Sequence, residues 1–235
     1  MGFKTAITAA IHNVHNHGYK PALYDVGVRV ANRFVTYRCL QCVVIETPDA
    51  QYRTLPGSFQ YARFRANEME GFSRFPEFEL DSNFLRTAAD KDDECHAILA
   101  GDTLASYGWY SKKPTGINDE LELDFDHNYV YMYKGFTHRS FRGHRLHAIG
   151  MTLALAHHRA AGRKGLLSYI EAQNYDSLKS CYRMGYRPCG QIRFFAVRGK
   201  YVILPSVECR SFGLRLYHVP ASDRHNHYLA RVNNG

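Results

Sequence analysis

Hydrophobic and polar positions alternate most clearly in the second half of the chain, and there the pattern predicts strands. Residues 95–101 and 103–111 form a predicted hairpin that turns at Gly101-Asp102. A longer alternating stretch predicts a strand at about 127–138. "GLLSYIEA" predicts a short apolar strand, and "GQIRFFAVRG" with "KYVILPSVECR" predicts a last hairpin.

A period of three to four residues predicts the helices between these strands. Apolar residues recur on one side of residues 145–161, and Gly162 is placed to end that helix. "NYDSLKSCYRMGY" predicts a shorter helix that Asn174 caps and Gly185 ends. Strands that alternate with helices and end in a hairpin predict an α/β domain with a mixed sheet.

The N-terminal half has a weaker pattern. It predicts a helix over 20–36, a strand over 37–46, a short aromatic helix over 58–72 and a second helix from Ser82 to Ala89. The chain is accordingly divided into three predicted parts. These are an N-terminal extension with a helix (1–36), the α/β domain (37–205) and a polar C-terminal extension (206–235).

Composition narrows the class of protein. Hydrophobic residues make up 45% and charged residues 22%, as in ordinary globular proteins, and 14% aromatic residues argue against disorder. No apolar run approaches the roughly 18 residues that a membrane span needs. The N-terminus is not typical of a signal peptide. A cytoplasmic protein without a membrane span is therefore expected.

The net charge of +8 is unevenly placed. Acidic residues gather at 119–126 and at 90–94, whereas residues 134–164 carry seven Lys and Arg and no acid. This polarity favours a site with a cationic and an anionic end over the uniform basic stripe of a specific nucleic-acid binder.

Cysteines and histidines offer two weak metal signals. Cys39 and Cys42 form a lone C-x-x-C within a predicted strand, where positions three apart point to opposite faces. Reduced structural thiols are the favoured interpretation. His12, His15 and His17 have the composition of a metal site, but a mobile tail or an irregular helix start is favoured for them. No metal is expected.

Three arginines surround the predicted start of the helix at 145–161. Arg139, Arg142 and Arg145 lie where the helix dipole is already positive, an unfavourable arrangement unless something anionic belongs there. A phosphate-bearing ligand is the hypothesis that this favours. The structural alternative is a basic helix end paired with the acidic clusters.

Two stretches, "FTHRSFRGHRLHAIGMTLAL" and "LLSYIEAQNYDSLKSCYRMGYRP", together resemble the GNAT acyltransferase superfamily in their order and spacing. The resemblance covers about residues 95–200 well and 37–94 loosely. It implies a GNAT-like mixed central β-sheet flanked by helices, with two splayed parallel strands and a C-terminal hairpin. The splayed strands would be about 127–138 and 166–172.

The resemblance also implies where a donor lies. Phe136 and Thr137 would offer backbone contacts near the thioester and pantetheine. The phosphate loop would consist of Arg142, Gly143, His144, Arg145, Leu146 and His147. Arg139 and Asn174 would make further contacts with the cofactor. Two loop positions depart from the family pattern, because Arg145 and His147 stand where glycines are common. His147 is expected to add bulk at the phosphate contact.

Catalytic residues follow less directly. By the resemblance, Cys181 would be the acid that protonates the leaving thiolate. Its alternative role is that of an inert core thiol. The neighbouring Tyr182 lies about 100° away around the helix. At the position where the family often has a carboxylate as general base, this chain has Tyr131. Glu171 is the carboxylate nearest the gap between the two splayed strands. Asn174 orients water or simply caps a helix. Tyr129, Tyr131 and Tyr133 line an acceptor pocket or belong to the core.

The leading functional hypothesis is an N-acyltransferase. Acetyl-CoA or a longer acyl-CoA would donate its acyl group to a small-molecule amine or amino acid by direct attack in a ternary complex. One alternative is an N-acyl amino acid synthase-like enzyme that takes long-chain acyl groups from an acidic acyl carrier protein. Another is a GNAT-fold binding protein without catalysis. A homodimer through the last hairpin is a further expectation, and the acceptor's identity is not readable.

Overall fold

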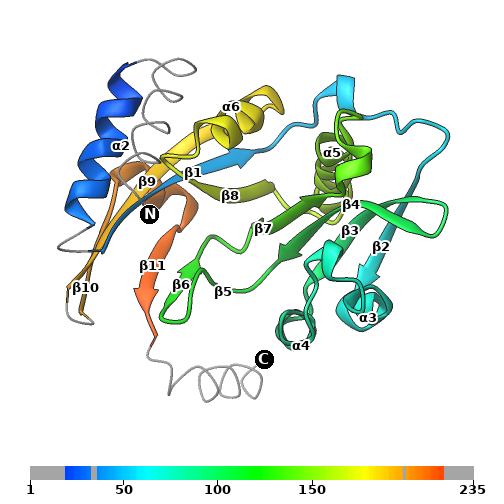
Figure 1. Cartoon of the computed structure of the whole chain (residues 1–235), viewed down its shortest axis with the longest axis horizontal. Helices are drawn as coiled ribbons and strands as arrows, with labels where there is room; N and C mark the ends of the chain where they lie inside the picture. The colour runs from blue at the N-terminus through cyan, green and yellow to red at the C-terminus, as the bar shows by residue number, and fades with distance from the viewer. Residues whose placement is uncertain (1–18, 33–35, 198–199, 220–235) are drawn as a thin grey trace.

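The computed structural model describes residues 19–32, 36–197 and 200–219, in which strands dominate (Figure 1). The strands run over Thr36–Ile45 (β1), Gln60–Arg65 (β2), Glu94–Ala100 (β3), Thr103–Ser111 (β4), Thr115–Gly116 (β5), Leu121–Asp124 (β6), Tyr129–Thr137 (β7), Gly165–Glu171 (β8), Arg187–Val197 (β9), Lys200–Pro205 (β10) and Arg215–His218 (β11).

The helices are fewer and mostly short. The α-helices run over Tyr19–Ala31 (α2), Glu70–Ser73 (α3), Ser82–Lys91 (α4), Leu146–Ala160 (α5) and Tyr175–Arg183 (α6). The 3-10 helices run over Ala50–Tyr52 (η1), Ala66–Met69 (η2), Pro76–Phe78 (η3), Arg139–Phe141 (η4) and Val207–Phe212 (η5). Among the described residues, no helix is both long and apolar enough to cross a membrane.

Eight strands form one mixed sheet in the order β10-β9-β1-β8-β7-β4-β3-β2, and β11, β6 and β5 form a second, small sheet. Helices α5 and α6 pack on one face of the large sheet over a shared hydrophobic core. The small sheet and η5 cover part of the other face, and α3 and α4 cover the rest. The predicted mixed sheet flanked by helices is confirmed, as is the hairpin β3–β4.

The parallel pair β7–β8 separates after three residues. Tyr129, Val130 and Tyr131 pair with residues 165–167, and the pairing then stops although both strands continue. A β-bulge explains the divergence, because β7 has one extra residue, Tyr133, opposite β4. A bulge bends its strand and increases the local twist. The predicted splay of two parallel strands is therefore present, and a bulge on β7 produces it.

The strand predicted at 37–46 occupies a position that its sequence did not reveal. As β1 it lies between β8 and β9 and is antiparallel to both. It is almost wholly buried from Cys39 to Ile45, as expected of a strand covered on both faces. The predicted last hairpin is present as β9–β10, whose turn lies outside the described residues.

Two predictions of local structure were wrong. Residues 58–72 were expected to form one helix, but residues 60–65 form the strand β2, and only Glu70–Ser73 is α-helical. Pairing with β3 outweighs the weak helical preference of this aromatic stretch. The helix expected over 20–36 ends at Ala31, since Thr36 already belongs to β1. The trio His12, His15 and His17 lies outside the described residues.

The segment predicted to be a C-terminal extension contributes to the core as far as Val219. Its residues Cys209, Leu214 and Leu216 are buried in the cluster beneath the small sheet. β11 pairs with β6, which joins this segment to the acidic stretch at 119–126. The boundary at 205 nevertheless stays a prediction.

Candidate functional site

The segment from Thr137 to α5 has a backbone that few residue types adopt. After η4 the chain passes through Gly143 at φ +89° and Arg145 at φ +58°, both in the left-handed region. Glycine adopts this region freely, whereas other residues are strained there. Arg145 thus keeps the backbone conformation that favours glycine, although its side chain departs from the family pattern.

This loop presents a row of unpaired backbone donors. Within the described residues, no backbone N–H from Gly143 to Ala148 donates a hydrogen bond, and Arg145 provides no side-chain cap for α5. The first turn of a helix leaves such N–H groups free and carries the positive end of the dipole. The local electrostatics therefore favour an anion here.

The three arginines around this loop are exposed and form no ion pair with a carboxylate of the described chain. The Arg142 side chain donates to the carbonyl of Thr137 at 3.4 Å. In the acidic stretch at 119–126, Asp124 forms an ion pair with Arg215 at 2.8 Å. In the part of the chain that the structure describes, the basic helix end and the acidic clusters are therefore not paired, which was the alternative to a ligand.

The gap between β7 and β8 opens directly beside this loop. At its apex, Ser168 Oγ donates to the carbonyl of Met132 at 2.8 Å. Beyond that bond, β7 continues to Thr137 without a partner strand on its β8 side. Ser106 holds this end on the β4 side by donating to the carbonyl of Phe136 at 2.7 Å. A ligand with amide groups finds unpaired backbone here.

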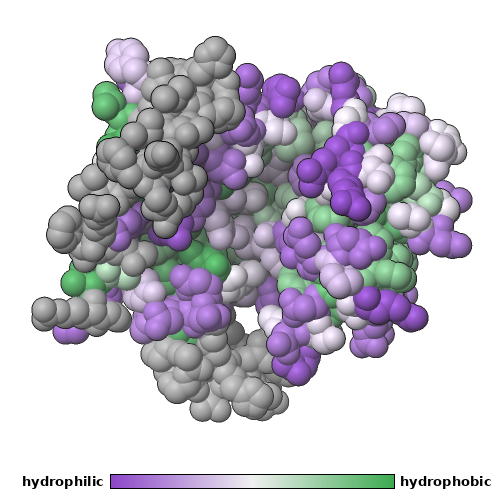
Figure 2. Space-filling model, viewed as in Figure 1, coloured by the Kyte–Doolittle hydropathy of each residue, from purple (hydrophilic) through white to green (hydrophobic). Residues whose placement is uncertain are grey.

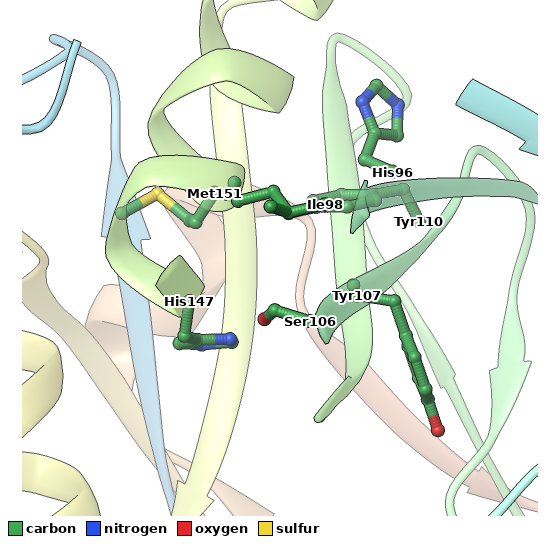
Figure 3. Close-up of a pocket in the computed structure, with 9 residues that line it drawn as sticks. His96, Ile98, Ser106, Tyr107, Tyr110, His147 and Met151 are labelled. Atoms are coloured by element: carbon green, nitrogen blue, oxygen red, sulfur yellow. The ribbon is translucent and has the colours of Figure 1, made fainter. Parts of the chain in front are cut away.

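His147 points away from the loop, as Figure 3 shows. Its ring lies between α5 and the sheet, facing Ser106 and the two opposed glycines Gly108 and Gly135. Burial lowers the pKa of this imidazole, which favours its neutral form. The expected bulk of the His147 side chain is therefore directed toward the sheet.

The two candidate acids on α6 lie in opposite surroundings. Cys181 is buried among the residues under α5 and α6, and burial raises the pKa of its thiol to about 12. Tyr182 is 40% exposed. Cys181 shares its core cluster with Met132 at the apex. The catalytic roles of Cys181 and Tyr182 stay predictions.

The remaining catalytic candidates lie on β7 and at the end of β8. Tyr131 is fully buried and stacks between Tyr133 and Tyr169. Glu171 lies 3.3 Å from Arg38 and lines a cavity of about 520 Å³. Asn174 lines the same cavity and caps α6 by accepting from the Ser177 N–H at 3.1 Å. The capping role of Asn174 is confirmed; the catalytic roles stay predictions.

The sequence analysis missed a buried charged network next to the bulge. Lys91 lies 2.7 Å from Asp93, and both are buried. Tyr133 donates to the same carboxylate at 2.9 Å, and the Lys91 ammonium lies 4.6 Å from the centre of its ring. The acidic cluster at 90–94 was visible in the sequence, but its burial was not.

Comparisons with known proteins give only distant structural matches. No protein-family model and no curated sequence matches the chain. Solved structures resemble it at low identity, among them a Drosophila protein (16% identity, TM-score 0.48, 76% of this chain). Another is a GCN5-related N-acetyltransferase from Sphaerobacter thermophilus (11% identity, TM-score 0.48, 77% of this chain). A third is an aminoglycoside N-acetyltransferase in complex with CoA (13% identity, TM-score 0.44, 56% of this chain).

The chain spans 58%, 55% and 90% of the lengths of these three proteins, respectively. Such a likeness concerns the fold alone, and the fold stands on the chain's own topology. The chain has the GNAT-like architecture that its sequence predicts: a mixed sheet, a parallel pair that diverges at a bulge, and a loop that leads from β7 into α5.

Proposed function

We propose that this protein is an N-acyltransferase that moves an acyl group from an acyl-CoA thioester to an amine. One observation carries the proposal: β7, at the end where it diverges from β8, leads straight into a loop whose six successive N–H groups are unpaired among the described residues. Exposed arginines without carboxylate partners surround that loop. This combination matches an elongated ligand that has amide groups at one end and phosphates at the other.

The donor's phosphates would bind the loop from Gly143 to Ala148, with Arg142 and Arg145 as side-chain partners. The backbone supplies aligned N–H dipoles, and the arginines supply charge. The pantetheine amides would pair with β7 at Phe136 and Thr137, where the β8 side is open. The thioester would then lie toward the apex at Met132 and Ser168.

The reaction would be a direct displacement at the thioester carbonyl. The amine nitrogen forms a bond to the carbonyl carbon, the carbon–sulfur bond breaks, and the electron pair leaves with the thiolate. An ammonium must first lose a proton. Glu171 is the proposed acceptor of that proton, because it lines the cavity at the end of β8. The attacking nitrogen loses its second proton as the amide forms. Solvent water would accept that proton and would protonate the thiolate, since Cys181 lies in the core.

A carrier-protein donor is the second candidate, because Arg139, Arg142 and Arg145 are exposed and unpaired among the described residues. An acidic carrier protein would complement them. Figure 2 shows that the face in view is largely hydrophilic, with hydrophobic residues gathered over the half that holds α3 and α5. The homodimer and the cytoplasmic location stay predictions.

The test is thermal unfolding with CoA, acetyl-CoA, a long-chain acyl-CoA and an acyl carrier protein. A ligand at 100 times its Kd stabilises the folded state by about 2.7 kcal/mol. Arg142→Ala should abolish the shift, whereas Arg86→Ala, an exposed arginine on α4, should not. Release of free thiol in the presence of an amine panel then separates an enzyme from a binding protein. No shift with any donor would refute the proposal.

A further inference from the structure

A second cluster of chemically active side chains lies at the other end of α5. It consists of Glu94 and His96 on β3 and of His157 and His158 on α5, and is here called the Glu94/His cluster. Glu94 Oε2 is 3.6 Å from His96 Nε2 and 3.7 Å from His157 Nε2. The three imidazole rings lie within 5.0–5.4 Å of one another, centre to centre.

Several polar atoms in this cluster are buried without a partner. Among the described residues, Glu94 Oε2, His96 Nε2 and both ring nitrogens of His158 make no hydrogen bond. His96 and His158 are each only 1% exposed. Burying a polar atom without compensation costs free energy, so such atoms in one place point to a missing ligand.

The side chains of the cluster are of the types that transition metals take. A neutral imidazole has a nitrogen lone pair to give, so the cluster offers nitrogen ligands together with one carboxylate oxygen.

We propose that the Glu94/His cluster binds a divalent transition-metal ion, with zinc the best match. Imidazole and carboxylate suit zinc, whereas calcium and magnesium take oxygen ligands. At bond lengths of about 2.0–2.1 Å, neighbouring ligands of tetrahedral zinc lie roughly 3.3 Å apart. The distances from Glu94 Oε2 to its two histidines require only a small contraction.

Neighbouring groups already orient two of the ligands. Tyr61 Oη lies 2.5 Å from His96 Nδ1, which leaves His96 Nε2 to face Glu94. Lys112 pairs with Glu94 Oε1, which leaves Oε2 to face the histidines. Arg63 opposes the ion, because its exposed guanidinium lies 3.0 Å from His157 Nε2. It would have to leave before the metal binds.

Ligand atoms of Glu94, His157 and His158 all lie within 4.8 Å of one another, and His96 Nε2, which is 3.6 Å from Glu94 Oε2, would be the fourth ligand. Four protein ligands would fill a tetrahedral shell, so the proposed site is structural and not catalytic. The ion would tie β3 to the last turn of α5, the helix whose first turn enters the phosphate loop. This proposal does not depend on the proposed acyltransferase activity. No sequence motif announces the site, because its two halves are more than 60 residues apart in the chain.

The test uses the full chain without an affinity tag, stripped of metal, and titrates it with Zn²⁺ by calorimetry and with Co²⁺ by visible absorption. One equivalent should bind, and Co²⁺ should give the absorption of a tetrahedral site. His157→Ala and Glu94→Gln should each weaken binding at least about 10-fold, since losing even an outer-shell partner typically has that effect. Arg63→Ala should tighten it.

Two control variants test whether histidines outside the Glu94/His cluster bind the metal. A variant with His12, His15 and His17 changed to Ala, and the separate exposed variant His218→Ala, should bind as the wild type does. Zinc binding that survives His157→Ala and Glu94→Gln but disappears when His12, His15 and His17 are changed to Ala would overturn the proposal. So would the absence of a tetrahedral Co²⁺ spectrum in the folded wild-type protein.

Discussion

The ring of His147 occupies the space that a side chain at Gly135 would need. A Cβ atom built on Gly135 lies 2.5 Å from His147 Cε1 and 2.8 Å from Met132 Cε. The largest departure of the loop from its family pattern is therefore matched by a glycine on the strand before it. His147 and Gly135 form one packing unit between α5 and the divergent end of β7.

Gly135→Ala should destabilise the protein by about 1–3 kcal/mol, the usual cost of placing a methyl group where other side chains already lie. His147→Ala in the same chain should recover most of that loss, because it removes the ring that the new methyl group meets. The measurement is urea-induced unfolding of the two single variants and the double variant.

The matched control is Gly57→Ala, where an added Cβ has no neighbour within 4 Å. It should change the free energy of unfolding by no more than about 0.5 kcal/mol. Additive effects of Gly135→Ala and His147→Ala would contradict the claim that the two residues form one unit.

Arg145→Gly should separate the backbone's role from the charge's role. At φ +58° a non-glycine residue is strained, so glycine should raise the free energy of unfolding by about 1 kcal/mol. Affinity for CoA should fall in the same variant because a cation is lost. Arg142→Gly is the control: at φ −64° glycine relieves no strain there, and stability should fall. Equal effects on stability at both positions would refute the strain argument.

Local pattern was enough to predict the loop and the helices α5 and α6, because their apolar spacing, glycines and cap act over a few residues. It could not predict that β1 lies between β8 and β9, since strand pairing depends on distant partners. The inward turn of His147 was likewise hidden, because it depends on Gly135. The Glu94/His cluster and the Lys91–Asp93 pair were not predicted, as each requires burial and neighbours that only the fold supplies.

Glu46 joins the inserted β1 to its surroundings and should make stability depend on pH. Burial alone would raise the pKa of this carboxyl, but hydrogen bonds from Arg187 at 2.6 Å and Tyr129 at 2.7 Å lower the pKa below its ordinary value. The folded state therefore gains stability above the unfolded pKa, and this gain is lost as pH falls below about 4.5.

Glu46→Gln should remove part of that acid sensitivity. Between about pH 5 and pH 3, the free energy of unfolding should fall less steeply in the variant than in the wild type. Chemical denaturation at several pH values measures the slope, with the exposed Glu77→Gln as control. An unchanged slope for Glu46→Gln would show that the ion pair with Arg187 contributes nothing to folding.

The buried pair of Lys91 and Asp93 yields the largest expected loss. Asp93→Asn would leave the Lys91 ammonium buried without its counter-ion, which costs about 3–5 kcal/mol.

Burial already lowers the pKa of Lys91, and the Asp93 charge opposes that shift, so removing the charge lowers the pKa further. A lysine whose folded pKa lies below its unfolded pKa gives stability that rises with pH. The variant should therefore recover part of its loss between pH 7 and pH 9.5 in urea unfolding, and Lys91→Met in the same chain should abolish that recovery. A loss below about 1 kcal/mol, flat with pH, would mean that water reaches Lys91 and that the pair is not sealed beneath Tyr133.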